Sequence, residues 1–156
     1  MFNKLKKGDE INILAPSSFI DKEEDFLSGV EILKNWGLKI VNNNILSRKF
    51  GSFAGDDLTR FEELEKAQNS KLIIFAKGGW GAARLLEKNP NWGNNLMMGF
   101  SDTSSLLLSK YSQGYSGSIH GPMITTLFKE PKWSLQRLRN LLFKGYVDDI
   151  NGISFK

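Results

Sequence analysis

The chain has 156 residues, of which 40% are hydrophobic and 12% aromatic, enough to bury one core in a single globular domain. It contains no cysteine and one histidine, His120, which excludes disulfides and thiolate zinc sites and argues against a histidine-built metal site. The net charge of +4 comes from 21 Lys and Arg against 17 Asp and Glu, spread along the chain. We therefore expect no nucleic-acid partner, because such proteins concentrate their basic residues in a patch.

The N-terminal segment is basic at Lys4, Lys6 and Lys7, but the apolar run that follows, residues 11–15, is too short for a signal peptide. No stretch of the sequence approaches the roughly 20 apolar residues of a membrane span. We therefore expect a cytoplasmic protein without a membrane partner.

Short apolar runs predict five strands, and helical spacing predicts helices between them. The predicted strands are residues 10–15, 38–41, 71–76, 96–100 and 116–119. The first predicted helix is residues 21–36, with Asp21 as its cap, and the second starts at Asp56 or Asp57 and runs to about residue 68. Two more are predicted at residues 82–88 and 103–112, the last with Lys110 and Tyr111 packed inward. Strands that alternate with helices predict an α/β fold, a doubly wound and mostly parallel sheet of about five strands with helices on both faces.

The C-terminal part of the chain follows another pattern. Residues 133–144 predict a helix that ends at Gly145, and residues 148–156 look extended. We therefore divide the chain into an α/β domain, 1–125, and a C-terminal helix and tail, 126–156, whose pattern ends unfinished, as in an incomplete protein. Apolar surface meant for the missing part should be exposed, so we expect self-association, for example as a homodimer, or limited solubility.

Ser101 is the leading candidate for a catalytic residue. The apolar run 96–100 ends in Gly99-Phe100-Ser101-Asp102, and a helical pattern begins at once. A sharp turn from strand to helix presents a serine hydroxyl beside backbone N–H groups that can hold an oxyanion. The alternative is that Ser101 only caps the helix, a position that serine favours.

A second loop, Lys77-Gly78-Gly79-Trp80-Gly81, follows a buried strand and opens a helix. Its glycines let backbone N–H groups approach a bound oxygen, as in an anion cradle. A nucleotide- or anion-binding module is therefore one alternative function, although Arg84 replaces the third glycine of a dinucleotide fingerprint. A non-catalytic interaction domain is another. In a parallel sheet the loops after residues 76, 100 and 119 meet at one edge, which favours an oxyanion role beside Ser101.

His120, in the third loop, is either a general base for Ser101 or a structural hydrogen-bonding residue. A base must reach the Ser101 hydroxyl and needs a carboxylate to orient it, and Asp102 is poorly placed for that task. The pattern Gly-x-Ser-x-Gly also fails at Thr103, which argues against the ordinary α/β-hydrolase fold.

Five motifs occur in an order and spacing that resemble the N-terminal domain of the LD-carboxypeptidases, a family that includes muramoyltetrapeptide carboxypeptidases and microcin C self-immunity peptidases. The motifs are Leu14-Ala15-Pro16-Ser17-Ser18, Phe53-Ala54-Gly55-Asp56, Lys77-Gly78-Gly79-Trp80-Gly81, Gly99-Phe100-Ser101-Asp102 and His120-Gly121-Pro122-Met123. The resemblance covers residues 11–123, far more than any single motif.

The resemblance implies that Ser101 is the nucleophile of a serine peptidase that needs no metal or organic cofactor. The backbone N–H of Asp102 and that of Gly78 or Gly79 would form the oxyanion hole. Lys77 and Trp80, where arginine and tyrosine are usual, would lie at the edge of the substrate site.

The resemblance also implies a substrate and a missing part. Such enzymes remove a terminal D-alanine from the L-centre of a diamino acid in cytoplasmic murein peptides. Their triad is completed by a glutamate and a histidine of a C-terminal domain, and His120 matches another element. We therefore expect this chain to be inactive alone, because loss of the base costs a triad several orders of magnitude in rate.

Overall fold

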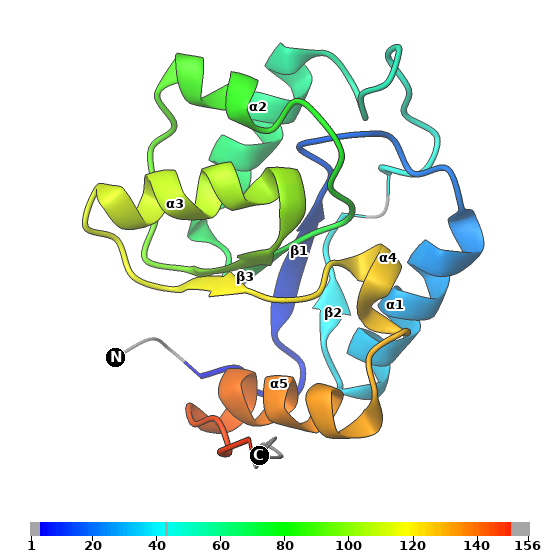
Figure 1. Cartoon of the computed structure of the whole chain (residues 1–156), viewed down its shortest axis with the longest axis vertical. Coiled ribbons are helices and arrows are strands. Elements are labelled where there is room, and N and C mark those ends of the chain that lie inside the picture. Colours follow the sequence, from blue (N-terminus) through cyan, green and yellow to red (C-terminus); the bar gives the residue numbers. More distant parts are fainter. Residues whose placement is uncertain (1–3, 43, 151–156) are drawn as a thin grey trace, which may run out of the picture.

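One five-stranded sheet, with every neighbouring pair of strands parallel, forms the centre of the molecule (Figure 1). The computed structural model describes residues 4–42 and 44–150. In spatial order the strands are β2 (Lys39–Ile40), β1 (Glu10–Leu14), β3 (Leu72–Phe75), β4 (Leu96–Gly99) and β5 (Ser118–His120). The predicted doubly wound α/β fold is confirmed.

The inner strands are buried on both faces, as a parallel sheet covered by helices requires. In β3, the side chains of Leu72 and Ile74 enter one hydrophobic cluster, whereas Ile73 and Phe75 enter the other. All four residues are 0% exposed. This alternation follows from the two-residue period of a strand, so the sequence Leu-Ile-Ile-Phe supplies apolar side chains to both layers.

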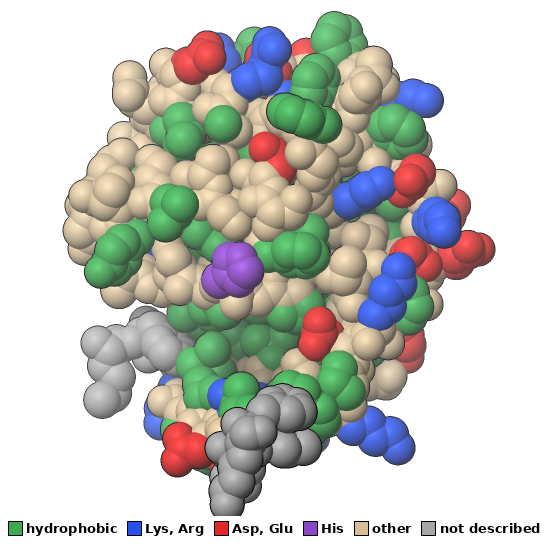
Figure 2. Space-filling model, viewed as in Figure 1, with side chains coloured by type: hydrophobic (Ala, Val, Ile, Leu, Met, Phe, Trp, Pro, Cys, Tyr) green, Lys and Arg blue, Asp and Glu red, His purple; other side chains and the backbone are tan. Residues whose placement is uncertain are grey.

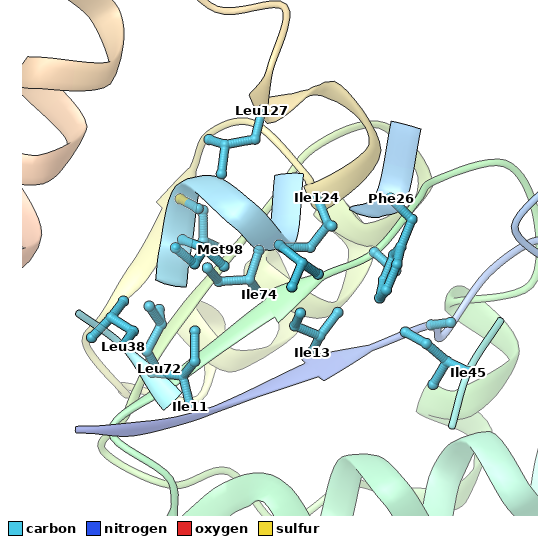
Figure 3. Packing of buried hydrophobic residues seen from close by; sticks show 14 of the residues in the cluster. Ile11, Ile13, Phe26, Leu38, Ile45, Leu72, Ile74, Met98, Ile124 and Leu127 are labelled. Atoms are coloured by element: carbon cyan, nitrogen blue, oxygen red, sulfur yellow. The ribbon is translucent and has the colours of Figure 1, made fainter. Parts of the chain in front are cut away.

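The helices cover both faces of the sheet. One layer holds α1 (Glu23–Asn35), α4 (Ile124–Leu127) and α5 (Lys132–Lys144), and Figure 3 shows its core, where Phe26, Ile124 and Leu127 meet Ile13 and Ile74 of the sheet. The other layer holds α2 (Asp57–Lys66), α3 (Ser104–Ser112) and the 3₁₀ helices η1 (Ala67–Asn69) and η2 (Ala83–Lys88). A third 3₁₀ helix, η3 (Ser101–Thr103), lies between β4 and α3. None of the described helices combines the length and the apolar character needed to cross a membrane.

The strand order places the site. The chain runs outward from β1 to β2, returns to β3, and then continues to β4 and β5 on the other side. The order therefore reverses between β1 and β3, and loops that leave this point diverge to opposite faces and open a crevice at the carboxyl ends of the strands. The loop after β1 and the glycine loop after β3 border this point, and the Ser101 turn after β4 lies next to them.

Several predicted elements differ in detail. The predicted short helix 82–88 takes the 3₁₀ form over residues 83–88, and the sequence pattern gives no sign of α4. Asp21 does not cap the first helix, because Lys22 stands at the N-cap and makes no side-chain cap bond. Tyr111, predicted to pack inward, is 72% exposed, whereas Lys110 is fully buried. Of the predicted extended tail, residues 151–156 lie outside the described residues, and the division at residue 125 stays a prediction.

Candidate active site

Ser101 stands at the tip of the turn between β4 and α3. Its backbone has φ +60, a left-handed conformation that side-chain-bearing residues adopt at a cost of about 1–2 kcal/mol. The residue is exposed, so its hydroxyl faces the solvent above the sheet edge. In the described structure neither η3 nor α3 has a side-chain cap bond at its start, so the capping role considered for Ser101 is not seen.

Gly78 lies directly against this serine. A Cβ built on Gly78 would lie 2.9 Å from both Cβ and Oγ of Ser101, so any side chain there would collide with the serine. Gly79 has φ +113, and a Cβ on it would run into the hydroxyl of Ser18. The close approach of the loop backbone to these two serine side chains therefore requires glycine at both positions.

The N–H groups of Gly78 and Gly79 are free to bind a ligand. Within residues 4–42 and 44–150, neither of them donates a hydrogen bond, although the neighbouring Trp80 N–H donates to Ser18 Oγ at 3.2 Å. Asp102 begins a helical turn, where N–H groups lack partners inside the helix. The predicted oxyanion donors thus lie in two neighbouring loops around Ser101.

The Asp102 side chain is half-buried and joins three loops. Its Oδ2 accepts a hydrogen bond from the Ser17 hydroxyl at 2.7 Å and another from the Ala82 N–H at 2.8 Å. Among the described residues, the Asp102 side chain therefore bonds to Ser17 and Ala82 and makes no hydrogen bond to His120.

A cavity of about 370 Å³ opens beside Ser101. It is lined by Asp21, Lys22, Asp25, Lys77, Gly78, Gly79, Phe100, Ser101, Met123, Thr125, Thr126 and Lys129. Two ion pairs cross its rim, Lys77 Nζ to Asp21 Oδ1 at 2.5 Å and Lys129 Nζ to Asp25 Oδ2 at 3.5 Å. Figure 2 shows acidic and basic side chains intermixed on the side where α1 and α4 lie. The hydrogen bond from Lys77 holds the pKa of the Asp21 carboxyl below its usual range.

The other predicted site residues lie at different distances from this cavity. Lys77 lines it, but its ammonium is already paired with Asp21. Trp80 belongs to the same glycine loop and is 76% exposed, yet it is not among the lining residues. His120 stands at the end of β5, where the centre of its ring lies 6.3 Å from that of Phe100, and it lines a separate cavity with residues of α3.

Sequence reasoning missed part of the cavity wall. Thr125 and Lys129 come from α4 and the turn after it, a segment with only one helical turn and no clear period. The sequence indicates Asp21 only as a helix cap, not as a residue of the wall. The described residues hold no group of three or more His, Cys, Asp or Glu side chains that could bind a metal ion.

Comparison with known proteins identifies the family of the chain. Residues 11–121 match the family described as LD-carboxypeptidase N-terminal domain. Over 148 residues the chain is 36% identical to a Synechocystis sp. protein provisionally named a carboxypeptidase, a match that covers 88% of this chain and 48% of that protein.

Solved structures with the same fold include the microcin C7 self-immunity protein MccF, with a TM-score of 0.81 and 22% identity over 91% of this chain and 46% of that one. Muramoyltetrapeptide carboxypeptidase from Oxalobacter formigenes gives a TM-score of 0.71 at 23% identity, over 84% of this chain and 47% of that one. The chain thus spans about half the length of the relatives it matches. It belongs to the LD-carboxypeptidase family, of which residues 11–121 form the N-terminal domain.

Proposed function

We propose that this chain supplies the nucleophile of a serine-type LD-carboxypeptidase, with Ser101 as that nucleophile. The observation that carries the proposal is the exposed hydroxyl on a left-handed turn, pressed against Gly78 beside N–H groups with no partner in the described structure. Preorganised N–H donors aimed at a developing oxyanion lower the barrier to acyl transfer more than most other catalytic effects.

In this mechanism Ser101 Oγ attacks the carbonyl carbon of the bond to the terminal residue. The negative charge that develops on the carbonyl oxygen is held by the N–H of Asp102 and by that of Gly78 or Gly79. When the tetrahedral intermediate collapses, the C–N bond breaks and the leaving nitrogen takes the proton that the activating base removed from Ser101 Oγ. The terminal amino acid departs with a free amine, and an ester to Ser101 remains. Water then hydrolyses the ester and frees the serine.

The activating base has to come from outside the described cavity wall. The residues that line the cavity include no histidine and no glutamate, and its carboxylates, Asp21 and Asp25, are paired with lysines. We propose that a glutamate and a histidine of a C-terminal domain fill this role, and that residues 1–156 alone are inactive. His120 then has a structural role beside Phe100.

For the substrate we propose a murein tetrapeptide in the cytoplasm, cleaved between the L-centre of its diamino acid and the terminal D-alanine. The muramoyltetrapeptide carboxypeptidase among the solved relatives supports this choice. Lys77, on the cavity wall, and Trp80, on the same loop, are proposed to contact the peptide. If the Lys77 ammonium leaves the Asp21 carboxylate and pairs with a carboxylate of the substrate, its positive charge stays paired.

The test is D-alanine release from murein tetrapeptide by two proteins. One is this chain, and the other is a chimera in which the part of the Synechocystis relative beyond the matched region follows this chain. We expect release only by the chimera, and its loss in Ser101→Ala. Ser104→Ala is the matched control, because Ser104 begins α3 but does not line the cavity.

Release by residues 1–156 alone that Ser101→Ala abolishes would show that a base within the chain suffices. Release that survives Ser101→Ala in the chimera would refute the proposed nucleophile. Absence of release by the unaltered chimera, together with thermal stabilisation of the chain by NAD or ATP, would favour a nucleotide-binding module instead.

A further inference from the structure

Arg60 is a fully buried cation at the back of the proposed oxyanion loop. It lies in α2, is 1% exposed, and stands 4.9 Å from the centre of the Phe53 ring. A buried guanidinium is tolerated only when its N–H groups are satisfied by acceptors. Its acceptors are Gly55 O at 3.1 Å, Gly81 O at 3.1 Å, Pro16 O and Asp57 Oδ1. Two of them, Gly81 O and Pro16 O, belong to the loops after β3 and β1.

The Asp102 carboxylate binds the same two loops from the other side. It accepts hydrogen bonds from Ser17 in the loop after β1 and from Ala82 at the end of the glycine loop. A cation and an anion, distant in sequence, therefore contact one pair of loops.

The two charges meet on a single peptide unit, the one that joins Gly81 to Ala82. Its C=O accepts from Arg60 Nη1, and its N–H donates to Asp102 Oδ2. Because a peptide unit is planar, any rotation of this plane would break both bonds at once. A Cβ on Gly81 would lie 2.8 Å from Arg60 Nη1 and from the Phe53 ring, so glycine is required for this approach.

The clamp, formed by the Arg60 and Asp102 side chains on this peptide, fixes the end of the loop that carries Gly78 and Gly79. The other end continues from β3, and Ser18 holds the middle of the loop. Its N–H donates to Gly78 O at 3.3 Å, and its Oγ accepts from the Trp80 N–H. Contacts with Arg60, Asp102 and Ser18 therefore fix the orientation of the loop and of its free N–H groups.

We propose that the Arg60 and Asp102 side chains are positioning residues that hold the 81–82 peptide, and with it the oxyanion loop, in its working orientation. The geometric part of this inference stands alone, whereas its catalytic consequence rests on the proposed function. Charge-assisted hydrogen bonds such as these are about twice as strong as neutral ones and suit such a clamp.

The first test is amide hydrogen exchange by NMR on residues 1–156. In Asp102→Ala the Ala82 amide should exchange at least ten times faster relative to the amide of Ile74, which lies in the centre of the sheet. Asp102→Asn should keep the Ala82 amide protected, because an amide oxygen can accept the same two bonds. Leu142→Ala, a core change in α5, controls for lost stability and should not raise the exchange rate of the Ala82 amide relative to that of Ile74.

The second test measures kcat and KM of the chimera with murein tetrapeptide. Asp102→Ala and Arg60→Met should each lower kcat at least tenfold and change KM less than twofold, because only transition-state contacts are lost. Arg60→Lys should recover part of kcat, since a lysine ammonium keeps the charge. If Asp102→Ala fails to fold, Arg60→Lys provides the exchange comparison, with the Ala82 amide again faster than in the unaltered chain.

The outcomes separate the two proposals. An unaltered exchange ratio at Ala82 in Asp102→Ala and Arg60→Lys would overturn the clamp even in an active chimera. An equal fall of kcat in Leu142→Ala would show that the effect comes from stability alone and would also overturn it. An inactive chimera with faster Ala82 exchange would support the clamp and count against the proposed function.

Discussion

Ser101 combines an exposed hydroxyl with a backbone conformation that serine adopts at a cost. If the surrounding contacts hold the turn at φ +60 whichever residue stands there, glycine at position 101 should relieve the conformational cost of the left-handed backbone. We predict that Ser101→Gly is about 0.5–1 kcal/mol more stable than Ser101→Ala, after allowance for the greater flexibility of glycine in the unfolded chain. Urea unfolding of both variants measures the difference.

Ser109, inside α3, provides the opposite case. There glycine should be about 1 kcal/mol less stable than alanine, because helical residues favour alanine. The same sign of the Gly-minus-Ala difference at both positions would show that the turn at Ser101 stores no strain.

At the residue scale, the sequence predicts those site residues whose role depends on their neighbours in the chain. The Gly99-Phe100-Ser101-Asp102 turn is of this kind, because an apolar run, a small residue and a helix start are all local signals. The role of Asp21 does not depend on its neighbours in the chain, since its partner Lys77 lies in a distant loop. The same holds for Arg60, whose helical position alone indicates an exposed side chain.

At the scale of elements, the two long helices of the first half start differently. The Asp56 side chain caps α2 by accepting from the Thr59 N–H at 2.7 Å, whereas Asp21 makes no such bond to α1. We predict that Asp56→Ala lowers the urea midpoint and that Asp56→Asn largely preserves it, because both Asp and Asn cap well. Asp21→Ala should leave the midpoint nearly unchanged, since an exposed ion pair contributes little. Equal losses in Asp56→Ala and Asp21→Ala would contradict this assignment.

Lys110 joins α3 to the loop that precedes β4. Its buried ammonium donates to Gly93 O at 2.7 Å, Asn95 O at 2.6 Å and Asn95 Oδ1 at 2.8 Å. Burial lowers the pKa of Lys110 from 10.5 to about 8. Between these values the unfolded chain binds more protons than the folded one, so this group makes the free energy of unfolding rise with pH from about 8 to 10.5.

The measurement is urea unfolding at several pH values in this window for the unaltered chain and for Lys110→Met. The difference in unfolding free energy between them should shift in favour of the unaltered chain as the pH rises. Lys88→Met, at an exposed lysine, is the control and should show no such trend. A pH-independent difference for Lys110→Met would refute the shifted pKa.

The elements found correctly are those with a long or uniform pattern. The four-residue apolar strands β3 and β4 and the helices α1, α2 and α5 are predicted because apolar period and turn residues agree. The single turn of α4 is not predicted, since one turn is too short to show a period. Packing against α1 stabilises α4, and that contact is not visible in the sequence.

At the scale of the whole molecule, apolar side chains remain on the surface. Leu108 and Tyr111 on α3 are 66% and 72% exposed, and Trp133 on α5 is 59% exposed. Figure 2 also shows hydrophobic side chains lining a hollow between α5 and the rest of the molecule. Exposed patches of this kind favour association.

We predict that residues 1–156 self-associate at micromolar concentrations, as measured by sedimentation velocity. The double variant Leu108→Lys and Tyr111→Lys should shift the distribution towards monomer. A matched pair of changes at Val41 and Leu58, exposed apolar residues elsewhere, should not. A monomer at all concentrations would contradict the prediction.

The overall topology was predictable because parallel strands and crossover helices leave few arrangements. That topology brings the loops after β1, β3 and β4 to one edge, which is why motifs far apart in the sequence form one site. The cavity wall from α1 and α4 required the packing of the whole layer and could not be read from any segment.

Detection of an acyl intermediate on Ser101 tests most directly whether this serine is the nucleophile. The chimera is mixed with murein tetrapeptide, quenched in acid within its first turnover and digested with trypsin. We predict that the peptide of residues 89–110 gains the mass of the substrate less D-alanine, and that fragmentation places the added mass on Ser101. An adduct on another serine would contradict Ser101 as the nucleophile. So would D-alanine release without any adduct on this peptide, in a chimera whose slow step is shown to be deacylation.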